Sequence, residues 1–432
     1  TFVANGNPII KYKYVGDPAA MVHDGKVYIY GGHDECPPPN EHYLINEWCV
    51  FSSPDLKTWT EHPVPLKAKD FSWAKGEAWA SRVIERDGKF YWYVTVEHKT
   101  IPGKSIGVAV SDSPVGPFKD ARGSALITND MTTEYTKIAR DDIDPTVFID
   151  DDGQAYLCWG NTQCYYARLK KNMIELDGPI MPINLPRYTE APWIHKRGDW
   201  YYLSYASEFP EKMCYAMSRN INGPWEYKGM IMDDNVAGTG TGSFTDHPGV
   251  IDYKGHSYMF YHGNPLDKSS SFHRSVCLEE FTYNDGGSIS QMDQTKEGVQ
   301  SVQNLNPYER VEAETIAWER GIDIENRADG GCNVRAIHDG NYIKVKDVDF
   351  GDKSPLSVSV NVACASAAQE GTIEFCIDCD EDILSEKSND TDLFGEGYDL
   401  HNTDVDSGEV IAYADVKSTG GEDVFKTIEG KI

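Results

Sequence analysis

The chain has 432 residues, of which 40% are hydrophobic and 25% are charged. This composition supports a sizeable buried core and excludes disordered, collagen-like and coiled-coil proteins. The length exceeds what one core usually fills, so we expect either two domains or one large repeat architecture. Acidic residues outnumber basic residues by 69 to 40, and the net charge of −29 repels phosphate backbones and anionic lipids. Nucleic acid is therefore not an expected partner.

No membrane segment is expected, because the sequence contains no run of about 18 apolar residues. Residues 1–8 lack the charged and apolar regions of a signal peptide. The ten cysteines are scattered, and several lie in apolar runs such as the one around Cys158, which predicts buried free thiols. Free thiols favour a cytoplasmic location. Secretion stays an open alternative, since the sequence starts at Thr1 and a leader removed before it would not be visible.

Residues 1–306 contain a repeat. A glycine turn between two runs rich in Tyr, Trp, Val and Ile occurs five times, at Gly25, Gly88, Gly153, Gly198 and Gly255. Asp-Gly between alternating apolar runs is typical of a β-hairpin. After most of these hairpins, a polar turn leads into another aromatic residue. Each unit thus predicts four short antiparallel strands, and five units predict an all-β, five-bladed β-propeller.

A carboxylate precedes each turn glycine at a similar distance and begins the apolar run that enters the hairpin. These residues are Asp17, Glu77, Asp144, Glu190 and Asp246. If that run is the innermost strand of its blade, all five acids surround one mouth of the central channel. A single Asp at a strand start commonly caps a turn. Five converging acids repel one another and raise one another's pKa values, which indicates acid/base chemistry or a bound cation.

Two further residues beside these acids are candidates for binding. Trp73, just before Glu77, either packs in the core or lines a sugar-binding floor. His247, just after Asp246, is either a strand-end histidine or a ligand to an ion in the channel, and we favour the ion. Two carboxyl groups are the minimum for glycoside hydrolysis, and a third explains how the proton donor stays protonated.

The second part of the chain differs in charge. From Glu309 onward there are 29 acidic and 11 basic residues, and a polar stretch at residues 285–306 precedes this shift. Such a stretch is typical of a linker or peripheral loop. We therefore expect a propeller domain at residues 1–306 and a second domain at residues 307–432.

The segments GDPAAMVHDGKVYIY, DDIDPTVFIDDDGQAYLCWG, YTEAPWIHKRGDWYYLSYAS and HRSVCLEEFTYNDGGSI resemble glycoside hydrolase family 43. The resemblance covers about residues 5–306. It implies a five-bladed propeller that hydrolyses arabinofuranosyl or xylosyl linkages of plant polysaccharides with inversion. It also implies Asp17 as general base, Asp144 as pKa modulator and orienting residue, and Glu190 as general acid.

The same resemblance implies that Arg274 contacts the sugar and that His247 faces a calcium ion, or its water shell, on the channel axis. Glu77 departs from the small or neutral residue expected in its motif, and we assign it a hydrogen bond to a sugar hydroxyl. The expected activity is release of α-L-arabinofuranosyl groups from arabinoxylan or its oligosaccharides, without an organic cofactor. The alternatives are a β-D-xylosidase, a bifunctional enzyme, or a non-catalytic carbohydrate-binding propeller whose acids hold a cation.

Residues 308–432 resemble a family 6 carbohydrate-binding module, through YERVEAETIAWERGIDIEN, DGGCNVRAIHDGNYIKVKDVDF and GTIEFCIDC. This implies a β-sandwich of the jelly-roll type. Glu312 and Glu314, two apart on an expected strand, face the same side and are candidate ligands of a structural calcium. The segment at 385–409 is longer and more acidic than the expected loop, and Ile432 lies where a closing strand pair should follow. We therefore expect an incomplete sandwich with a structural role.

Overall fold

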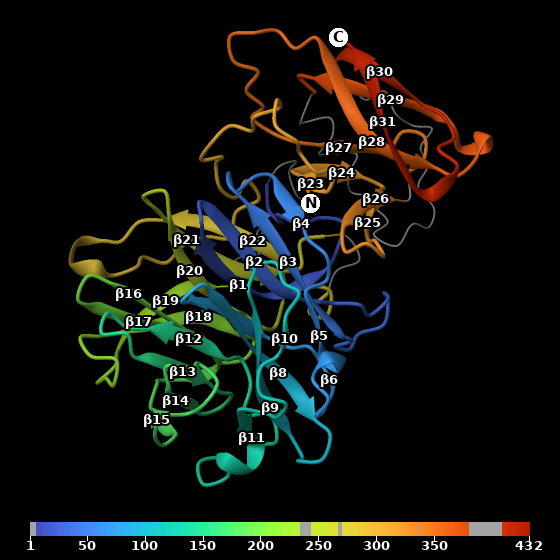
Figure 1. The fold of residues 1–432 in the computed structure, drawn as a ribbon. Helices are drawn as coiled ribbons and strands as arrows, with labels where there is room; N and C mark the ends of the chain where they lie inside the picture. Colours follow the sequence, from blue (N-terminus) through green and yellow to red (C-terminus); the bar gives the residue numbers. More distant parts are fainter. Residues whose placement is uncertain (1–5, 234–242, 267–269, 336, 380–407) are drawn as a thin grey trace.

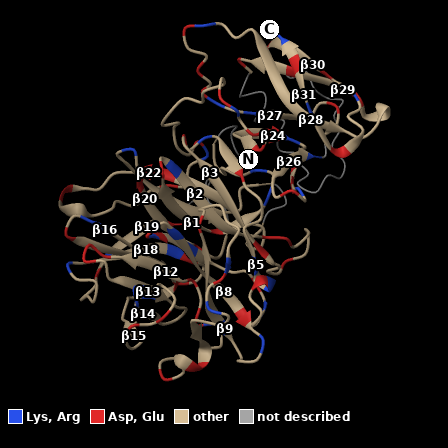
Figure 2. Ribbon diagram, viewed as in Figure 1, with Lys and Arg blue, Asp and Glu red and all other residues tan. Residues whose placement is uncertain are grey.

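The computed structural model describes residues 6–233, 243–266, 270–335, 337–379 and 408–432. These residues form β-strands and four short 3-10 turns, with no α-helix among them. In this described part of the chain, no helix is long and apolar enough to cross a membrane. Acidic residues occur on loops and strands of both parts of the chain (Figure 2).

Five antiparallel sheets form the first part of the chain (Figure 1). Blade 1 comprises β1 (Val15–His23), β2 (Lys26–His33), β3 (Glu47–Ser53), β4 (Trp59–Glu61) and β5 (Leu66–Lys67). Blade 2 comprises η1 (Ala68–Asp70), β6 (Ala74–Gly76), β7 (Ser81–Arg86), β8 (Lys89–His98), β9 (Lys104–Ser111), β10 (Lys119–Asp120) and β11 (Ile127–Thr128). Blade 3 comprises η2 (Asn129–Met131), β12 (Thr146–Ile149), β13 (Ala155–Trp159), β14 (Cys164–Leu169) and β15 (Met181–Ile183). Blade 4 comprises β16 (Tyr188–Arg197), β17 (Trp200–Ser207), β18 (Lys212–Ser218) and β19 (Glu226–Asp233). Blade 5 comprises β20 (Gly249–Tyr253), β21 (His256–Gly263) and β22 (Ser275–Phe281), followed by η3 (Asp285–Gly287).

The inner strands close into a ring. Strands β1, β7, β12, β16 and β20 each contact the next, and β20 contacts β1 again. The N-terminal segment lies along β22: the backbone N–H of Ile9 donates to Val276 O at 2.9 Å, and the Asn7 amide bonds both backbone groups of Leu278 at 3.0 and 3.2 Å. This segment occupies the place of a fourth strand in blade 5. The predicted five-bladed propeller is confirmed.

The repeated glycines sit in the predicted hairpin turns. Gly25 joins β1 to β2 with φ of 72°, and Asp24 before it has φ of 44°. Two consecutive residues with positive φ match the right-handed twist of the flanking strands, which explains the Asp-Gly pair. The other four turn glycines also have positive φ.

The hydrophobic core consists of clusters of buried side chains between neighbouring blades. One buried cluster joins blades 1 and 2 through Trp48 and Trp92, whose ring centroids lie 5.8 Å apart. Comparable clusters join each further pair of neighbouring blades around the ring. All ten cysteines are free and most are buried, as the apolar runs around them predict.

The C-terminal part begins as an extension of the propeller. Its strands and turn are β23 (Thr315–Ile316), β24 (Trp318–Arg320), β25 (Asp323–Asn326), β26 (Cys332–Arg335), β27 (Tyr342–Lys344), β28 (Ser357–Cys364), η4 (Ala367–Gln369), β29 (Gly371–Ile377), β30 (Glu409–Val416) and β31 (Gly421–Lys431). Strand β23 pairs with β4 and so adds to the sheet of blade 1, while Ile316, Ile322 and Ile324 join the cluster between blades 1 and 5. The boundary expected near Pro307 thus precedes a strand that pairs with the propeller.

The remaining C-terminal strands pair β24 with β27, β25 with β26, β28 with β31, and β29 with β30. This β-rich arrangement fits the predicted sandwich, and β28–β31 lie apart from the propeller in Figure 1. Most of the acidic segment at 385–409 lies outside the described residues.

Candidate active site

The structure brings Asp17, Asp144 and Glu190 together at the centre of the ring. The charges of Glu190 and Asp17 both act on Asp144, and the charge of Asp17 acts on Glu190. All three carboxyls belong to inner strands or to the residues just before them, on β1, β12 and β16. Three strands far apart in sequence therefore supply one cluster of acids.

The local backbone sets the direction of these side chains. Asp17, Glu77 and Asp144 have left-handed backbone conformations, with φ of 51°, 64° and 57°. In blade 4 the residue with this conformation is Ala191, at 55°, so Glu190 stands one position earlier than the acids of the first three blades. Non-glycine residues rarely adopt positive φ, and such strain is concentrated at functional sites.

The pairing of the inner strands is interrupted at these positions. The register shifts between Gly16 and Ala19 in β1, and between Glu190 and Trp193 in β16. A β-bulge of this kind turns a side chain away from the regular alternation of the strand. The acids of the first four blades, predicted to be equivalent, therefore fall into two backbone positions.

Asp17 is held as a carboxylate. Its Oδ1 lies 2.7 Å from Arg274 Nη1, 3.4 Å from His262 Nδ1 and 3.6 Å from His247 Nδ1. Burial alone would raise the pKa of Asp17, but the Arg274 guanidinium and the two imidazoles lower it to about 2. Asp17 is thus ionised at neutral pH and suited to accept a proton.

Arg274 is fixed by a second carboxylate. Its Nε and Nη2 each donate to Asp34 at 2.9 Å, in a bidentate pair that is buried on both sides. A Cβ on Gly16 would lie 2.3 Å from Arg274 Cζ, so only glycine fits where this guanidinium crosses β1. Arg274 was expected to contact the sugar; its side chain is 3% exposed and bridges Asp34 and Asp17.

Asp144 links two blades. Its backbone N–H donates to Thr95 Oγ1 at 3.0 Å, and its Oδ2 accepts the backbone N–H of Ala191 at 3.0 Å. Burial and the charges of Glu190 and Asp17 raise the pKa of Asp144 well above its usual value. Because Ala191 follows Glu190, this contact also positions the strand that carries Glu190.

Glu190 has the surroundings of a proton donor. Asn161 Nδ2 donates to its Oε2 at 2.6 Å, and its carboxyl hydrogen-bonds the side chain of Glu211. Burial, together with the charge of Asp17, raises the pKa of Glu190 despite these hydrogen bonds. The cluster therefore combines one ionised carboxylate with carboxyls that retain a proton to higher pH.

Trp73 and Glu77 lie in other surroundings. Trp73 is buried between blades 1 and 2, packs on Phe71, and donates from Nε1 to Asp120 at 3.0 Å. It offers little surface to a sugar, and core packing describes it better. Glu77 is 38% exposed and forms an ion pair with Lys104, whose ammonium lies 3.6 Å above the Trp79 ring.

An aromatic row that the sequence did not predict leads away from Arg274. We call it the aromatic arc; it consists of Trp79, Tyr43, Phe272, Phe244 and Phe209. The Tyr43 ring lies 5.0 Å from Arg274 Cζ, and successive ring centroids lie 4.8 to 5.9 Å apart. Phe209 at its far end is 72% exposed. Partly exposed aromatic faces suit the apolar faces of sugar rings.

The donors around His247 do not favour direct calcium binding. Calcium takes six to eight oxygen ligands. Among the described residues, the charged groups acting on His247 are Asp17, already paired with Arg274, and Arg274 itself. Burial lowers the pKa of His247, so its imidazole is neutral and able to contact a water molecule.

The predicted calcium pair in the C-terminal part has a different geometry. Glu312 and Glu314 lie in the turn before β23, not on a strand, so the expected alternation does not place them on one face. Glu312 is half-exposed and accepts two hydrogen bonds from Arg310 at 2.7 and 3.0 Å, whereas Glu314 is buried. The strand argument for this site was wrong.

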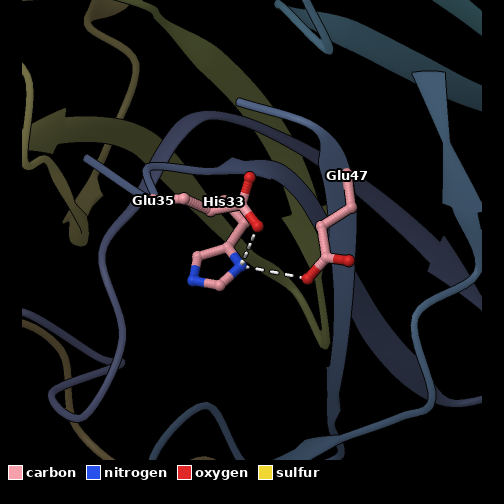
Figure 3. Close-up of side chains that lie close together, drawn as sticks. All are labelled: His33, Glu35 and Glu47. Carbon is pink, nitrogen blue, oxygen red and sulfur yellow. Dashed lines mark hydrogen bonds and ion pairs between the residues drawn. The ribbon is translucent and has the colours of Figure 1, made fainter. Parts of the chain in front are cut away.

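A separate group of potential ligands lies beside Asp34. His33, Glu35 and Glu47 place three ligand atoms within 4.8 Å of one another, and both carboxylates face the imidazole (Figure 3). The distances from His33 Nδ1 are 3.0 Å to Glu47 and 3.8 Å to Glu35. Asn46 also donates twice to Glu35, at 2.9 and 2.7 Å. Hydrogen bonds within the protein account for this cluster.

Sequence reasoning missed Asp34, Asn161 and His262. Each lies at the end of the second strand of its blade, in the motifs GGHD, CWGN and YHG. The hairpin is antiparallel, so the end of its second strand returns to the start of the first, where the acid stands. Polar residues at the end of the second apolar run were therefore the available signal.

Comparison with known proteins agrees with this geometry. The sequence pattern of glycosyl hydrolases family 43 matches residues 5–289, and that of carbohydrate-binding module family 6 matches residues 312–389. An arabinoxylan arabinofuranohydrolase of Paenibacillus polymyxa is 29% identical over 99% of this chain and 70% of its own length.

Two solved structures are also similar. The family 43 arabinoxylan arabinofuranohydrolase of Bacillus subtilis, in complex with cellotetraose, has a TM-score of 0.80 and 28% identity, over 100% of this chain and 93% of its own. A β-xylosidase/α-arabinofuranosidase from a compost metagenome, with xylotriose and in a calcium-free form, has a TM-score of 0.59 and 29% identity, over 67% of this chain and 98% of its own. The protein is a glycoside hydrolase that belongs to glycosyl hydrolases family 43.

Proposed function

We propose that the protein is an inverting exo-glycosidase that releases α-L-arabinofuranosyl groups from arabinoxylan or its oligosaccharides. One observation carries the mechanism: Arg274 holds Asp17 as a carboxylate, while burial and neighbouring charge keep a proton on the nearby carboxyls. An ionised base and a protonated acid in one cluster are what hydrolysis of a glycosidic bond requires.

In this mechanism, Asp17 takes a proton from water as the water oxygen attacks the anomeric carbon. Glu190 gives its proton to the leaving oxygen as the glycosidic bond breaks. Asp144 and Glu190 are coupled, because a charge on one of these carboxyls favours a proton on the other, and Asp144 positions Glu190 through Ala191. Direct attack by water inverts the anomeric configuration, and such enzymes separate the two carboxyls by about 6.5 to 9.5 Å.

The proposed substrate is a substituted xylan. The arabinoxylan relative is similar over nearly the whole chain, and the aromatic arc offers stacking surfaces beside the acids. A β-D-xylosidase activity is the second candidate, favoured by the xylosidase/arabinofuranosidase structure that shares this fold. We retain Arg274 and Glu77 as candidate sugar contacts.

We propose calcium as a hydrated ion on the channel axis, because one related structure is described as calcium-free and the neutral His247 imidazole suits a water ligand. The experiment is a thermal melt with calcium or with chelator, on wild type and on His247→Ala. A calcium-induced rise in Tm that His247→Ala abolishes supports the site. Equal melting of wild type with and without calcium contradicts it.

We propose that residues 1–306 and 307–432 form two domains and that the second domain is a module with a structural role. Pairing of β23 with β4 supports that role. Sugar binding by the module is tested by affinity electrophoresis of the full chain in arabinoxylan gels, with the catalytic residue Glu190 replaced by Gln so that the gel is not degraded.

The activity itself is tested with chromogenic α-L-arabinofuranosides and β-D-xylosides on wild type, Asp17→Ala and Glu190→Gln. Asp17→Ala should be inactive on every substrate, whereas Glu190→Gln should retain activity on those with good leaving groups. Equal rates in all three proteins would contradict catalysis and favour a non-catalytic binding propeller. Proton NMR of the first-formed sugar anomer tests inversion.

A further inference from the structure

Glu211 is a buried acid beside Glu190 with no role in the mechanism above. It lies between β17 and β18 in blade 4 and is 2% exposed. Its backbone N–H donates to Phe244 O at 3.2 Å, and its Oε2 accepts the backbone N–H of Asp246 at 2.7 Å. The segment that enters blade 5 therefore fixes the position of the Glu211 carboxyl.

The side chains of Glu211 and Glu190 are hydrogen-bonded to each other. Two ionised carboxylates have no proton with which to form such a bond, so at least one of the pair is protonated whenever the bond exists. Asn161 also contacts Glu190, since its amide donates to Glu190 Oε2 at 2.6 Å. Glu190 thus has one contact from blade 3 and one from blade 4.

We propose that Glu211 is a positioning residue that acts as a neutral carboxylic acid and donates a hydrogen bond to Glu190. The proposal rests on the role of Glu190 as general acid. When the O–H bond of Glu190 breaks, its proton goes to the leaving oxygen, and the electron pair of the glycosidic bond goes to that same oxygen. Glu211 keeps its own proton throughout. Glu211 and Asn161 each donate a hydrogen bond to the new Glu190 carboxylate.

The electrostatics agree with this assignment. Burial, then the charge of Glu190, raises the pKa of Glu211 to about 11, so it stays protonated in the working range. Its hydrogen bond lowers the pKa of Glu190 against the effect of burial. A proton donor that burial alone would make too weak an acid is thereby brought closer to the working pH.

The test compares two replacements of similar size. Gln at position 211 keeps an N–H donor and Met has none, so Glu211→Gln should rescue what Glu211→Met loses. The control is Glu279→Gln, which alters another buried, hydrogen-bonded acid with a raised pKa, on the outer strand of blade 5. Melting curves confirm that each variant is folded, and Glu190→Gln is assayed alongside.

For each variant, kcat is measured on a p-nitrophenyl arabinofuranoside and on an arabinoxylo-oligosaccharide, whose leaving group is poor. Glu211→Met should lower kcat on the oligosaccharide about 10- to 100-fold, with a much smaller loss on the aryl substrate and with KM unchanged. Glu211→Gln should recover most of this loss, and Glu279→Gln should leave the ratio of the two rates unchanged. Equal losses on both substrates, or equal behaviour of the Gln and Met variants, would overturn the proposal. If Glu190→Gln shows no leaving-group dependence, the general-acid assignment fails instead.

Discussion

Arg274 Nη1 lies 2.7 Å from Asp17 Oδ1, although 257 residues separate the two in sequence. Arg274 also forms a bidentate pair with Asp34, so the cation that holds Asp17 ionised is itself held in place. The proton-accepting form of Asp17 therefore depends on a contact between the first and last blades, which only the closed ring provides.

Removing this cation should shift the acidic limb of the pH profile. The double variant Arg274→Gln/Asp34→Asn removes both charges of the pair, while burial of Asp17 continues to raise its pKa. Asp17 would then be protonated, and inactive as a base, up to a higher pH. We expect the acidic limb of kcat/KM to move upward. Glu190, Asp144, His247 and His262 also act around this carboxyl, and all four are unchanged in the variant.

Asp34→Asn alone is the matched control, because Arg274 stays beside Asp17. Its acidic limb should stay at low pH. A double variant with the wild-type acidic limb would show that Arg274 does not set the protonation of Asp17.

Replacing Asp144 with Asn should shift the basic limb. Asn keeps an oxygen that accepts the Ala191 N–H but carries no charge. Adjacent buried carboxyls raise each other's pKa, so losing one charge lowers the pH at which the remaining proton is lost. The basic limb of kcat/KM should therefore move to lower pH. An unchanged or raised basic limb would contradict the assigned role of Asp144.

The raised pKa of Glu211 should lower the free energy of unfolding at neutral pH. The pKa of Glu211 is raised from 4.5 to about 11, so between these values the folded protein binds a proton that the unfolded chain does not. In that window the free energy of unfolding falls as pH rises, by about 1.4 kcal/mol per pH unit for one proton. Glu211→Gln removes this dependence and should melt at a higher temperature than wild type at pH 8. Melting temperatures of the two proteins from pH 5 to pH 9 check the sign; parallel curves would contradict it.

The sequence predicted the features that depend on local repetition. Turn glycines and the apolar runs beside them identify the blades, and the acids at the starts of inner strands follow from the same repeat. Contacts between distant segments were not predictable, such as those of Asp34 with Arg274, 240 residues apart. Bulge geometry was also missed, because the offset of Glu190 depends on the positive φ of Ala191. The strand assumed for Glu314 was wrong, because this residue lies in the turn before β23. The two readings left open for Trp73 could not be separated from sequence, because the burial of a side chain depends on the neighbouring elements.

Contacts of the C-terminal part should contribute measurably to stability. Trp318 is 1% exposed, packs with Tyr14 and Leu266 of the propeller, and lies 5.0 Å from the Lys11 ammonium. Loss of a buried Trp side chain typically costs about 3 to 5 kcal/mol. Trp318→Ala should therefore lower the Tm by several degrees. Leu356→Ala, at a position that is 82% exposed, is the control and should leave the Tm unchanged. Equal melting of both variants would show that the two parts are stable independently.

The aromatic arc should matter for long substrates. Phe209 is 72% exposed, and among the described rings it contacts Phe244 at 5.7 Å, so Phe209→Ala removes a stacking surface with little effect on folding. A small aryl glycoside is expected to contact the acids and not Phe209, so its kcat and KM should not change. On polymeric arabinoxylan, loss of one stacking contact of about 1 kcal/mol should raise KM about fivefold with kcat retained. The ratio of kcat/KM on polymer to that on the aryl glycoside isolates this effect, because any loss of folded enzyme cancels. A ratio equal to that of wild type would show that the xylan chain of the substrate does not pass over Phe209.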